Sequence, residues 1–290
     1  MVSGLRPLFK QEGFSNCLPS DTIYGEMRIG YIQTDPKFGA VTDNLTHVEA
    51  LISGDQADLW VLPELFATGY QFRSKQEAAG LSEPIPEGVT SRFLADLAAR
   101  RNCYIAAGLA EKGKDGSLYN AAILVGPDGF ISCYRKVHLF YKEKLWFSPG
   151  DKPFPVIDIG MAKVGMMICF DHLFPEAART LGLAGAEVIV HPANLVIPEY
   201  GQLTMRVRAI ENGVFTVTAN RIGIEKRDGE TLRFTGESQI VSPNGEVLVK
   251  GAHDREEVRV VEIDSRKARD KSLNPYNDRF ADRRPELYRI

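Results

Sequence analysis

The chain has 290 residues, of which 44% are hydrophobic and 25% are charged. These proportions are typical of a folded globular protein with a full apolar core. Its 35 basic and 38 acidic residues give a formal net charge of −3, which argues against nucleic acid or an anionic membrane as a partner. No apolar run approaches the roughly 20 residues that span a bilayer.

Cysteine spacing limits the chemistry further. Cys17, Cys103, Cys133 and Cys169 are far apart and form no CxxC pair. Neither a zinc site nor a disulfide framework is expected from this spacing, and we expect no metal and no cofactor. Reduced thiols indicate a cytoplasmic protein.

The first 26 residues differ from the rest of the chain. They lack the apolar region of a signal peptide and show no regular hydrophobic period. A strand pattern begins only at Met27. We therefore expect residues 1–26 to be an N-terminal extension, and their composition leaves open whether it is ordered.

From Met27 onward, strand-like and helix-like segments alternate. In the first half, the strand pattern covers 27–34 and 58–64, and the helical period covers 43–53 and 90–102. Asp43 is the expected N-cap of the first helix. Further strands are expected in CYIAAGLAEK, YNAAILVGPDG and FISCYRKVHLF, with a hairpin turn at 127–129.

The second half repeats this alternation. Strands are expected in MAKVGMMIC, EVIVHPA, VFTVTAN and EVRVVEID, and helices in 174–186 and QLTMRVRAIENG. FTGESQIVSPNGEVLVK adds a hairpin with Asn244-Gly245 at its turn. Apolar strands interleaved with helices predict an α/β fold in which mixed sheets are covered by helices.

No linker or low-complexity tract divides the chain, so we expect one domain over residues 27–271. Residues 272–290 are charged and aromatic without a core period. We expect them to form a C-terminal tail that packs over a neighbouring surface.

Three polar residues do not fit the apolar strands beside them. Glu64 follows the run Trp-Val-Leu-Pro, where a buried charge is costly unless it is paired. Lys136 lies between Tyr134 and Val137 in a segment too apolar for two solvated bases. Cys169 ends an apolar strand just before a helix, and such a bend exposes the thiol to free backbone N–H groups.

Together these residues form a complete set for hydrolysis. A cysteine attacks a carbonyl or nitrile carbon, a glutamate takes up its proton and returns it to the leaving nitrogen, and a lysine stabilises the oxyanion. Cys169 alone would be read as a small core residue. Glu64 and Lys136 change that interpretation.

Three segments resemble the signature motifs of the nitrilase superfamily of carbon–nitrogen hydrolases. They are PELFATGY, YRKVHLF and GMMICFDHLFPEAAR, in the order that the family shows. The similarity continues through HPANLV and RAIENGVFTVTANR, so it covers the chain from about Met27 to the tail. The compact chain is similar to nitrilase-like enzymes of thermophilic prokaryotes.

The resemblance assigns roles position by position. Glu64 matches the family's general base, Lys136 its oxyanion lysine and Cys169 its nucleophile. Glu143 matches a second glutamate that helps to position the attacking groups, and the backbone N–H of Phe170 would be the second oxyanion donor.

The resemblance also implies an assembly. The family fold is an αββα sandwich that usually dimerises through the helix after the cysteine, often with an exchanged C-terminal tail. We therefore expect a homodimer or higher homo-oligomer with residues 176–186 and the tail, 272–290, at the interface.

The residues after the nucleophile bear on the substrate. Long nitrilases usually show Cys-Trp-Glu, whereas this chain has Phe170 and Asp171 after Cys169, as amide-cleaving and carbamoyl-cleaving members tend to. D-amino-acid carbamoylases place arginines where this chain has His172 and Leu173. We expect hydrolysis of small linear amides, with small aliphatic nitriles as the alternative and N-carbamoyl compounds as a further one.

Nearness to the motifs identifies candidate substrate-binding residues. They are Tyr70, His138, His172 and Asn194, with Phe72, Trp146 and Phe147 as further pocket walls. An aromatic-rich pocket indicates a small, largely uncharged substrate.

Two other classes of protein compete with this interpretation. A Cys-His hydrolase would use His172 or His191 as its base, but it leaves Glu64 and Lys136 unexplained. A catalytically silent binding protein is disfavoured, because it need not keep costly buried charges.

Overall fold

The computed structural model describes residues 26–288, and two six-stranded sheets form its centre. The first sheet has the order β14 (Glu257–Asp264), β1 (Glu26–Gln33), β2 (Leu59–Val61), β3 (Tyr104–Lys112), β4 (Leu118–Gly126), β5 (Gly129–Arg135). The second has the order β13 (Val247–Lys250), β12 (Gln239–Val241), β9 (Phe215–Ala219), β8 (Val188–Pro192), β7 (Lys163–Met166), β6 (Val156–Asp158).

Both sheets are mixed, as the sequence predicted. In the first sheet β1, β2 and β3 run parallel, whereas β14, β4 and β5 pair antiparallel to their neighbours. In the second sheet β7, β8 and β9 run parallel, flanked by antiparallel β6 and β12. The hairpins β4–β5 and β12–β13 form where the turn sequences indicated.

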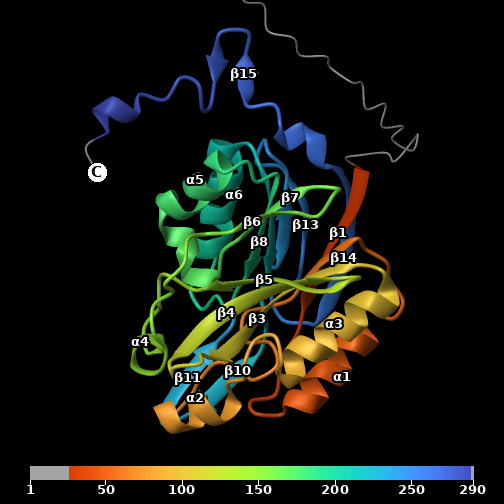
Figure 1. Cartoon of the computed structure of the whole chain (residues 1–290), viewed down its shortest axis with the longest axis vertical. Coiled ribbons are helices and arrows are strands. Elements are labelled where there is room, and N and C mark those ends of the chain that lie inside the picture. Colours follow the sequence, from red (N-terminus) through yellow and green to blue (C-terminus); the bar gives the residue numbers. More distant parts are fainter. Residues whose placement is uncertain (1–25, 289–290) are drawn as a thin grey trace, which may run out of the picture.

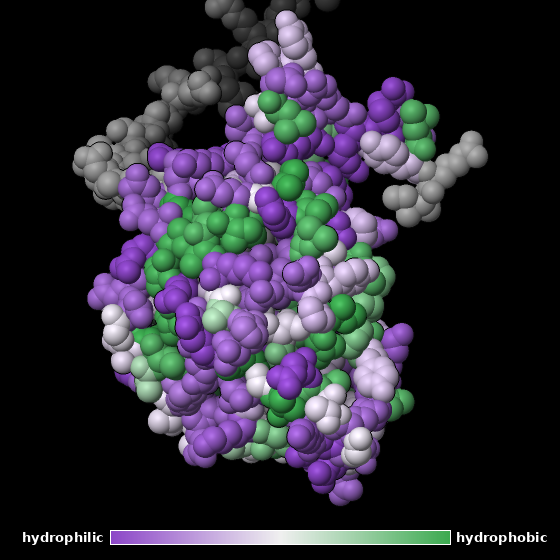
Figure 2. Space-filling view, turned by 180° about the vertical axis from the view of Figure 1, so that it is seen from behind, coloured by the Kyte–Doolittle hydropathy of each residue, from purple (hydrophilic) through white to green (hydrophobic). Residues whose placement is uncertain are grey.

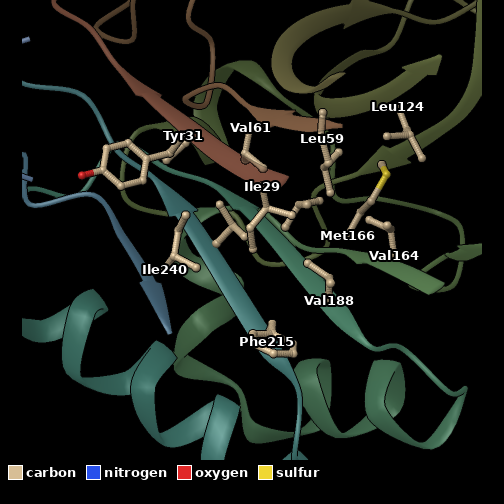
Figure 3. Close-up of a cluster of buried hydrophobic side chains, with 14 of the residues drawn as sticks. Ile29, Tyr31, Leu59, Val61, Leu124, Val164, Met166, Val188, Phe215 and Ile240 are labelled. Carbon is tan, nitrogen blue, oxygen red and sulfur yellow. The ribbon is translucent and has the colours of Figure 1, made fainter. Parts of the chain in front are cut away.

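The sheets pack face to face through an apolar core (Figure 3). Alternate residues of a strand point to the same face, so pairs two residues apart enter this layer together. The first sheet contributes the pairs Ile29–Tyr31 and Leu59–Val61. The second contributes the pair Val164–Met166, together with Val188, Phe215 and Ile240.

Helices cover the two outer faces. α1 (Val41–Leu51) and α3 (Val89–Arg101) pack on the first sheet, mainly through leucine and valine side chains. α5 (Pro175–Leu183) and α6 (Tyr200–Asn212) cover the second sheet. The layer order is helix–sheet–sheet–helix (Figure 1), which confirms the predicted αββα sandwich.

Smaller elements complete the described chain. α2 (Lys75–Leu81), α4 (Glu143–Trp146) and the hairpin β10 (Ile224–Arg227)–β11 (Glu230–Arg233) lie toward the lower end of Figure 1. Short 3₁₀ helices cover Cys169–Leu173, Ser265–Ala268 and Pro285–Leu287.

The C-terminal segment contacts α5 and α6, where Nε of Arg279 donates to the Ile210 carbonyl oxygen at 2.9 Å and Arg179 lies over the ring of Phe280. β15 (Ser272–Asn274) and β16 (Asn277–Asp278) form a small hairpin that projects at the top of Figure 1. Tyr276 at its tip is 91% exposed. Figure 2 shows the same projection from behind, together with apolar patches between hydrophilic regions of the surface.

Some local predictions were wrong. The first helix begins at Val41, and Asp43 lies inside its first turn instead of capping it. The strand that was expected to reach Cys169 ends at Met166, because the chain turns into a 3₁₀ helix there. The helix expected over 174–186 covers Pro175–Leu183.

The expected extension lies almost wholly outside the described residues. Only Glu26 of residues 1–26 is described, and it belongs to β1. Among residues 26–288, none of the helices combines the length and the apolar character that a membrane crossing requires.

Candidate active site

Glu64 lies just beyond β2 with its carboxylate fully buried. Gly108 on β3 makes room for it, since a Cβ there would lie 2.5 Å from the Cα of Glu64. Oε1 accepts hydrogen bonds from Lys136 Nζ at 2.6 Å and Asn120 Nδ2 at 2.7 Å, whereas Oε2 has no partner within the described residues. One oxygen is thus held in place and the other is available for proton transfer.

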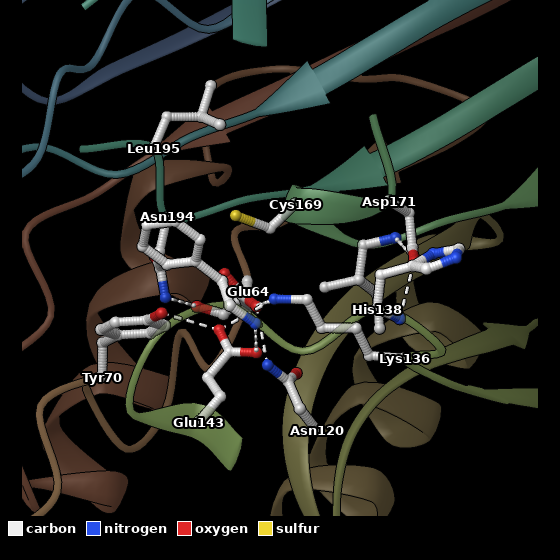
Figure 4. Close-up of polar contacts among 12 residues, drawn as sticks. Glu64, Tyr70, Asn120, Lys136, His138, Glu143, Cys169, Asp171, Asn194 and Leu195 are labelled. Atoms are coloured by element: carbon white, nitrogen blue, oxygen red, sulfur yellow. Dashed lines mark hydrogen bonds and ion pairs between the residues drawn. The ribbon is translucent and has the colours of Figure 1, made fainter. Parts of the chain in front are cut away.

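Lys136 follows β5 and is also fully buried. Its ammonium lies 2.8 Å from Oε1 of Glu143, the first residue of α4. Glu143 is held in turn, because Tyr70 Oη donates to Oε1 at 2.7 Å and the Phe140 N–H donates to Oε2 at 3.1 Å. Figure 4 shows both carboxylates turned toward the Lys136 ammonium.

Cys169 stands at the turn between β7 and the 3₁₀ helix, with 5% of its surface exposed. Its φ of 40° is in the left-handed region, which disfavours residues with a side chain. His191 on β8 supports this turn, since its Nε2 lies 2.9 Å from the Cys169 carbonyl oxygen. A carbonyl only accepts, so Nε2 carries the proton, and Nδ1 accepts from the Thr218 hydroxyl at 3.1 Å.

Burial shifts the pKa values of the cluster. Desolvation raises the pKa of Glu64 to about 7, partly offset by the charge of Lys136. Desolvation and the Glu64 charge raise the pKa of the Cys169 thiol well above its usual value. Burial alone disfavours the Lys136 ammonium, but the charges of Glu143 and Glu64 outweigh it and raise the pKa. At neutral pH the cysteine is therefore a thiol beside a carboxylate that titrates near neutrality.

Asp171 joins the segment of Lys136 to the turn of Cys169. One carboxylate oxygen accepts from Tyr134 Oη at 2.8 Å and the Ile168 N–H at 2.9 Å. The other accepts from the backbone N–H of His138 at 3.2 Å and lies 2.7 Å from its Nδ1. This buried carboxylate is therefore fully hydrogen-bonded.

A small cavity of about 30 Å³ opens beside Cys169 and contains two of the four predicted substrate-binding residues, His172 and Asn194. The rest of its lining is mainly apolar: Phe140, Phe170, Leu195, Val196, Ile197, Tyr200 and Gly201. Its volume is far below the range of about 300–1,000 Å³ for ligand pockets, so the space beside Cys169 admits only a small group.

The other predicted pocket residues are not among those that line this cavity, and their binding roles stay predictions. Tyr70 reaches the catalytic cluster by its hydroxyl but does not line the cavity. The ring of His138 is bonded to Asp171 and stacks on Phe174 at 3.7 Å between centroids. Phe72, Trp146 and Phe147 pack in a separate apolar cluster. Nearness to a motif in sequence did not determine the direction of these side chains.

The sequence analysis missed two groups that support the site. Asn120 is a polar residue within the apolar strand β4, so the criterion that selected Glu64 would also have selected it. His191 was considered only as a base, but both of its nitrogens are bonded to other groups. Within residues 26–288, no cluster of three or more His, Cys, Asp or Glu side chains has the arrangement of a metal site.

Comparison with known proteins agrees with this geometry. The profile of the family described as "Carbon-nitrogen hydrolase" matches residues 28–271. The chain belongs to this family. It is 51% identical over 265 residues to a nitrilase of Pyrococcus abyssi, a match that covers 90% of this chain and 99% of the relative. It is also 37% identical over 245 residues to an (R)-stereoselective amidase of a Pseudomonas species, covering 82% and 85% of the two chains.

Solved structures of this carbon–nitrogen hydrolase family share the fold. A carbon-nitrogen hydrolase from Helicobacter pylori G27 matches 91% of this chain and 97% of its own with a TM-score of 0.83 at 27% identity. An amidase of the nitrilase superfamily from Nesterenkonia AN1 matches 91% and 96% with a TM-score of 0.76 at 27% identity. The resemblance to the nitrilase superfamily is therefore confirmed.

Proposed function

We propose that this carbon–nitrogen hydrolase cleaves small linear amides to a carboxylic acid and ammonia through a thioester on Cys169. The observation that carries the proposal is the carboxylate of Glu64. One of its buried oxygens has no hydrogen-bond partner among residues 26–288, its other oxygen is fixed by Lys136, and its pKa is about 7. A group with this pKa is suited both to accept and to return a proton at neutral pH.

The first half-reaction forms the thioester. Oε2 of Glu64 takes the thiol proton as Sγ of Cys169 attacks the amide carbon, and the carbonyl electron pair moves onto oxygen. Lys136 and the N–H of Phe170 stabilise that oxyanion, since N–H groups in the first turn of a helix have no intrahelical acceptor. Glu64 then gives its proton to the nitrogen, the C–N bond breaks and ammonia leaves.

The second half-reaction hydrolyses the thioester. Glu64 takes a proton from water as the water oxygen attacks the thioester carbon. The tetrahedral adduct collapses, the C–S bond breaks and the proton returns to the sulfur, which releases the acid. Glu143 keeps Lys136 in position through both steps by its contact of 2.8 Å.

Nitrile hydrolysis is the second candidate, favoured by the 51% identity to a chain named as a nitrilase. Attack of Cys169 on a nitrile gives a thioimidate, water adds to it, and loss of ammonia leads to the same thioester. N-carbamoyl compounds are a third candidate, because an N-carbamoylputrescine amidase of Solanum lycopersicum is 33% identical over 276 residues. Among residues 26–288, no lysine or arginine lines the cavity to hold a substrate carboxylate.

The proposal is tested by measuring ammonia release from three matched groups of substrates. These are amides such as propionamide, nitriles such as propionitrile, and N-carbamoyl compounds. We expect turnover of the amide, and its loss in Cys169→Ala with an unchanged melting temperature. Turnover of the nitrile alone would replace the first candidate by the second. No turnover in any group would support a silent binding protein, and full activity of Cys169→Ala would refute the mechanism.

We also propose a homodimer in which residues 27–271 are the hydrolase domain and 272–290 are a tail at the interface. Support comes from α6, where apolar side chains are exposed at the helical spacing of one face: Tyr200, Leu203, Val207 and Ile210. The projecting tail exposes Leu273 and Tyr276 as well. A cytoplasmic location is part of the proposal, supported by the free thiols of Cys103, Cys133 and Cys169.

A further inference from the structure

The side chain of His172 adds a polar ring to the lining of a cavity that is otherwise mainly apolar. It lies in the 3₁₀ helix after Cys169, is 4% exposed and lines the cavity. Its carbonyl oxygen accepts from Nε of Arg208, which fixes the backbone at this residue. The rings of His191 and Tyr200 each lie edge-on to it at 6.0 Å between centroids. A hydrogen-bonding group in this position can contact a ligand that binds beside Cys169.

Thr204 on α6 sets the proton on this ring. Its Oγ1 lies 2.7 Å from Nδ1 of His172, and also 2.9 Å and 3.0 Å from the carbonyl oxygens of Tyr200 and Gly201. A hydroxyl has one proton, and a carbonyl oxygen has none to give. A threonine in a helix commonly donates to a carbonyl of its own preceding turn, and in that arrangement Thr204 accepts from Nδ1 of His172.

In this arrangement Nδ1 of His172 carries the proton and Nε2 has only a lone pair. No described residue hydrogen-bonds to Nε2, which leaves this nitrogen for a ligand in the cavity. Burial and the nearby charge of Arg208 lower the pKa of His172 to about 4, so the ring is neutral under the conditions in which Glu64 works as a base.

We propose that Nε2 of His172 accepts a hydrogen bond from a donor on the substrate, so that the cavity selects small uncharged amides bearing a hydroxyl or N–H group away from the reacting bond. This inference rests on the proposed amide hydrolysis. It adds one polar contact to a cavity whose other walls favour apolar groups. It also distinguishes the site from one that holds a carboxylate, because a neutral acceptor repels an anionic group.

Matched amide pairs test the selection. Lactamide is compared with isobutyramide, 3-hydroxypropanamide with butanamide, and 4-hydroxybutanamide with pentanamide, so that each pair exchanges a hydroxyl for a methyl group. At the chain position that reaches Nε2 we expect kcat/KM to favour the hydroxyl by on the order of 5- to 10-fold, the effect of one hydrogen bond. Preference for the methyl group in every pair would overturn the proposal.

Thr204→Val and Thr204→Ser provide the decisive comparison. Thr204 does not line the cavity, and valine keeps its shape while removing the hydroxyl that fixes the tautomer. We expect Thr204→Val to lose the preference for the hydroxyl substrate and Thr204→Ser to keep it, with the rate on the methyl substrates unchanged in both. An undiminished preference in Thr204→Val would show that Thr204 does not set the acceptor.

Two readouts separate this proposal from the proposed function. The ¹⁵N chemical shifts of the histidine rings report the tautomer without turnover, and we expect a bare Nε2 for His172 and a protonated Nε2 for His191. A protonated Nε2 on His172 in the wild type would refute the inference. Calorimetric binding of the same pairs to the Cys169→Ala protein gives the preference even if no amide is hydrolysed, in which case only the proposed function fails.

Discussion

The ammonium of Lys136 lies 2.6 Å from Oε1 of Glu64, and the other oxygen of the same carboxylate has no partner in the described chain. Lys136 therefore orients Glu64 without occupying the oxygen that we propose takes up the thiol proton. Both groups are fully buried. The charge of Lys136 favours the ionised form of Glu64, and the charges of Glu143 and Glu64 favour the Lys136 ammonium. Several consequences of this pair are measurable.

The pH dependence of kcat/KM is the first. Glu64 must be ionised to take the proton of Cys169, and burial raises its pKa from 4.5 to about 7. Activity is therefore expected to fall as the pH falls through about 7, because kcat/KM reports the pKa values of the free enzyme. The rate of thiol alkylation by iodoacetamide should follow the same curve. An acid limb centred near 4.5 would contradict the assignment.

Glu64→Gln is expected to separate activity from stability. Activity should fall by roughly 10²–10⁴-fold, as for loss of a general acid–base. The pKa of Glu64 is higher in the folded state than in the unfolded state. The free energy of unfolding therefore falls as the pH rises from 4.5 to about 7, and the whole loss is present above pH 7. Removing the charge should leave the melting temperature near pH 8 unchanged or higher. A large loss of stability there would show that the ionised carboxylate stabilises the fold.

Lys136→Met should have the opposite effect on stability. It leaves Glu64 and Glu143 buried without a cation, which costs about 3–5 kcal/mol of unfolding free energy. Because ionised carboxylates cause the loss, it should be larger near pH 8 than near pH 5, as urea denaturation can measure. Adding Glu64→Gln to Lys136→Met should recover part of the stability. A loss independent of pH would instead indicate that the aliphatic stem of Lys136 matters more than its charge.

The sequence indicated candidate reacting groups but not their arrangement. Glu64, Lys136 and Cys169 each adjoin an apolar strand, and a charge or thiol in that position is chemically conspicuous. Their meeting depends on two sheets packing so that the ends of β2, β5 and β7 come together, which no local pattern encodes. Asp171 illustrates this limit, because its role requires donors from two segments 30 residues or more apart in sequence.

Side-chain direction could not be predicted from the sequence. Tyr70 and His138 are near the motifs in sequence, and both were expected to line the pocket. The backbone N–H of Tyr70 donates to Glu225 of β10 at 3.1 Å, and its hydroxyl donates to Glu143 at 2.7 Å. These partners are 155 and 73 residues away in sequence, so the contacts are not visible in the local sequence.

Tyr70→Phe tests the contact of this residue with Glu143. The hydroxyl donates to the carboxyl group of Glu143 at 2.7 Å, and loss of a hydrogen bond to a charged group costs about 1.5–3 kcal/mol. We expect kcat to fall with KM unchanged, because Tyr70 does not line the cavity. Tyr104→Phe is the matched control, since no hydrogen bond of its hydroxyl occurs in residues 26–288. A raised KM with an unchanged kcat would restore Tyr70 to the substrate-binding residues.

The exposed face of α6 tests the proposed assembly. Tyr200 lies on this face and also lines the cavity, so a partner bound here would bear on the active site. We expect the wild type to sediment as a dimer, and Leu203→Glu with Val207→Glu to sediment as a monomer with reduced activity. Val89→Glu introduces a charge at an equally exposed apolar residue of α3, and it should behave as the wild type. A wild type that is monomeric at micromolar concentration would refute the dimer. If a variant stays dimeric but loses activity, these residues affect the cavity and not the assembly.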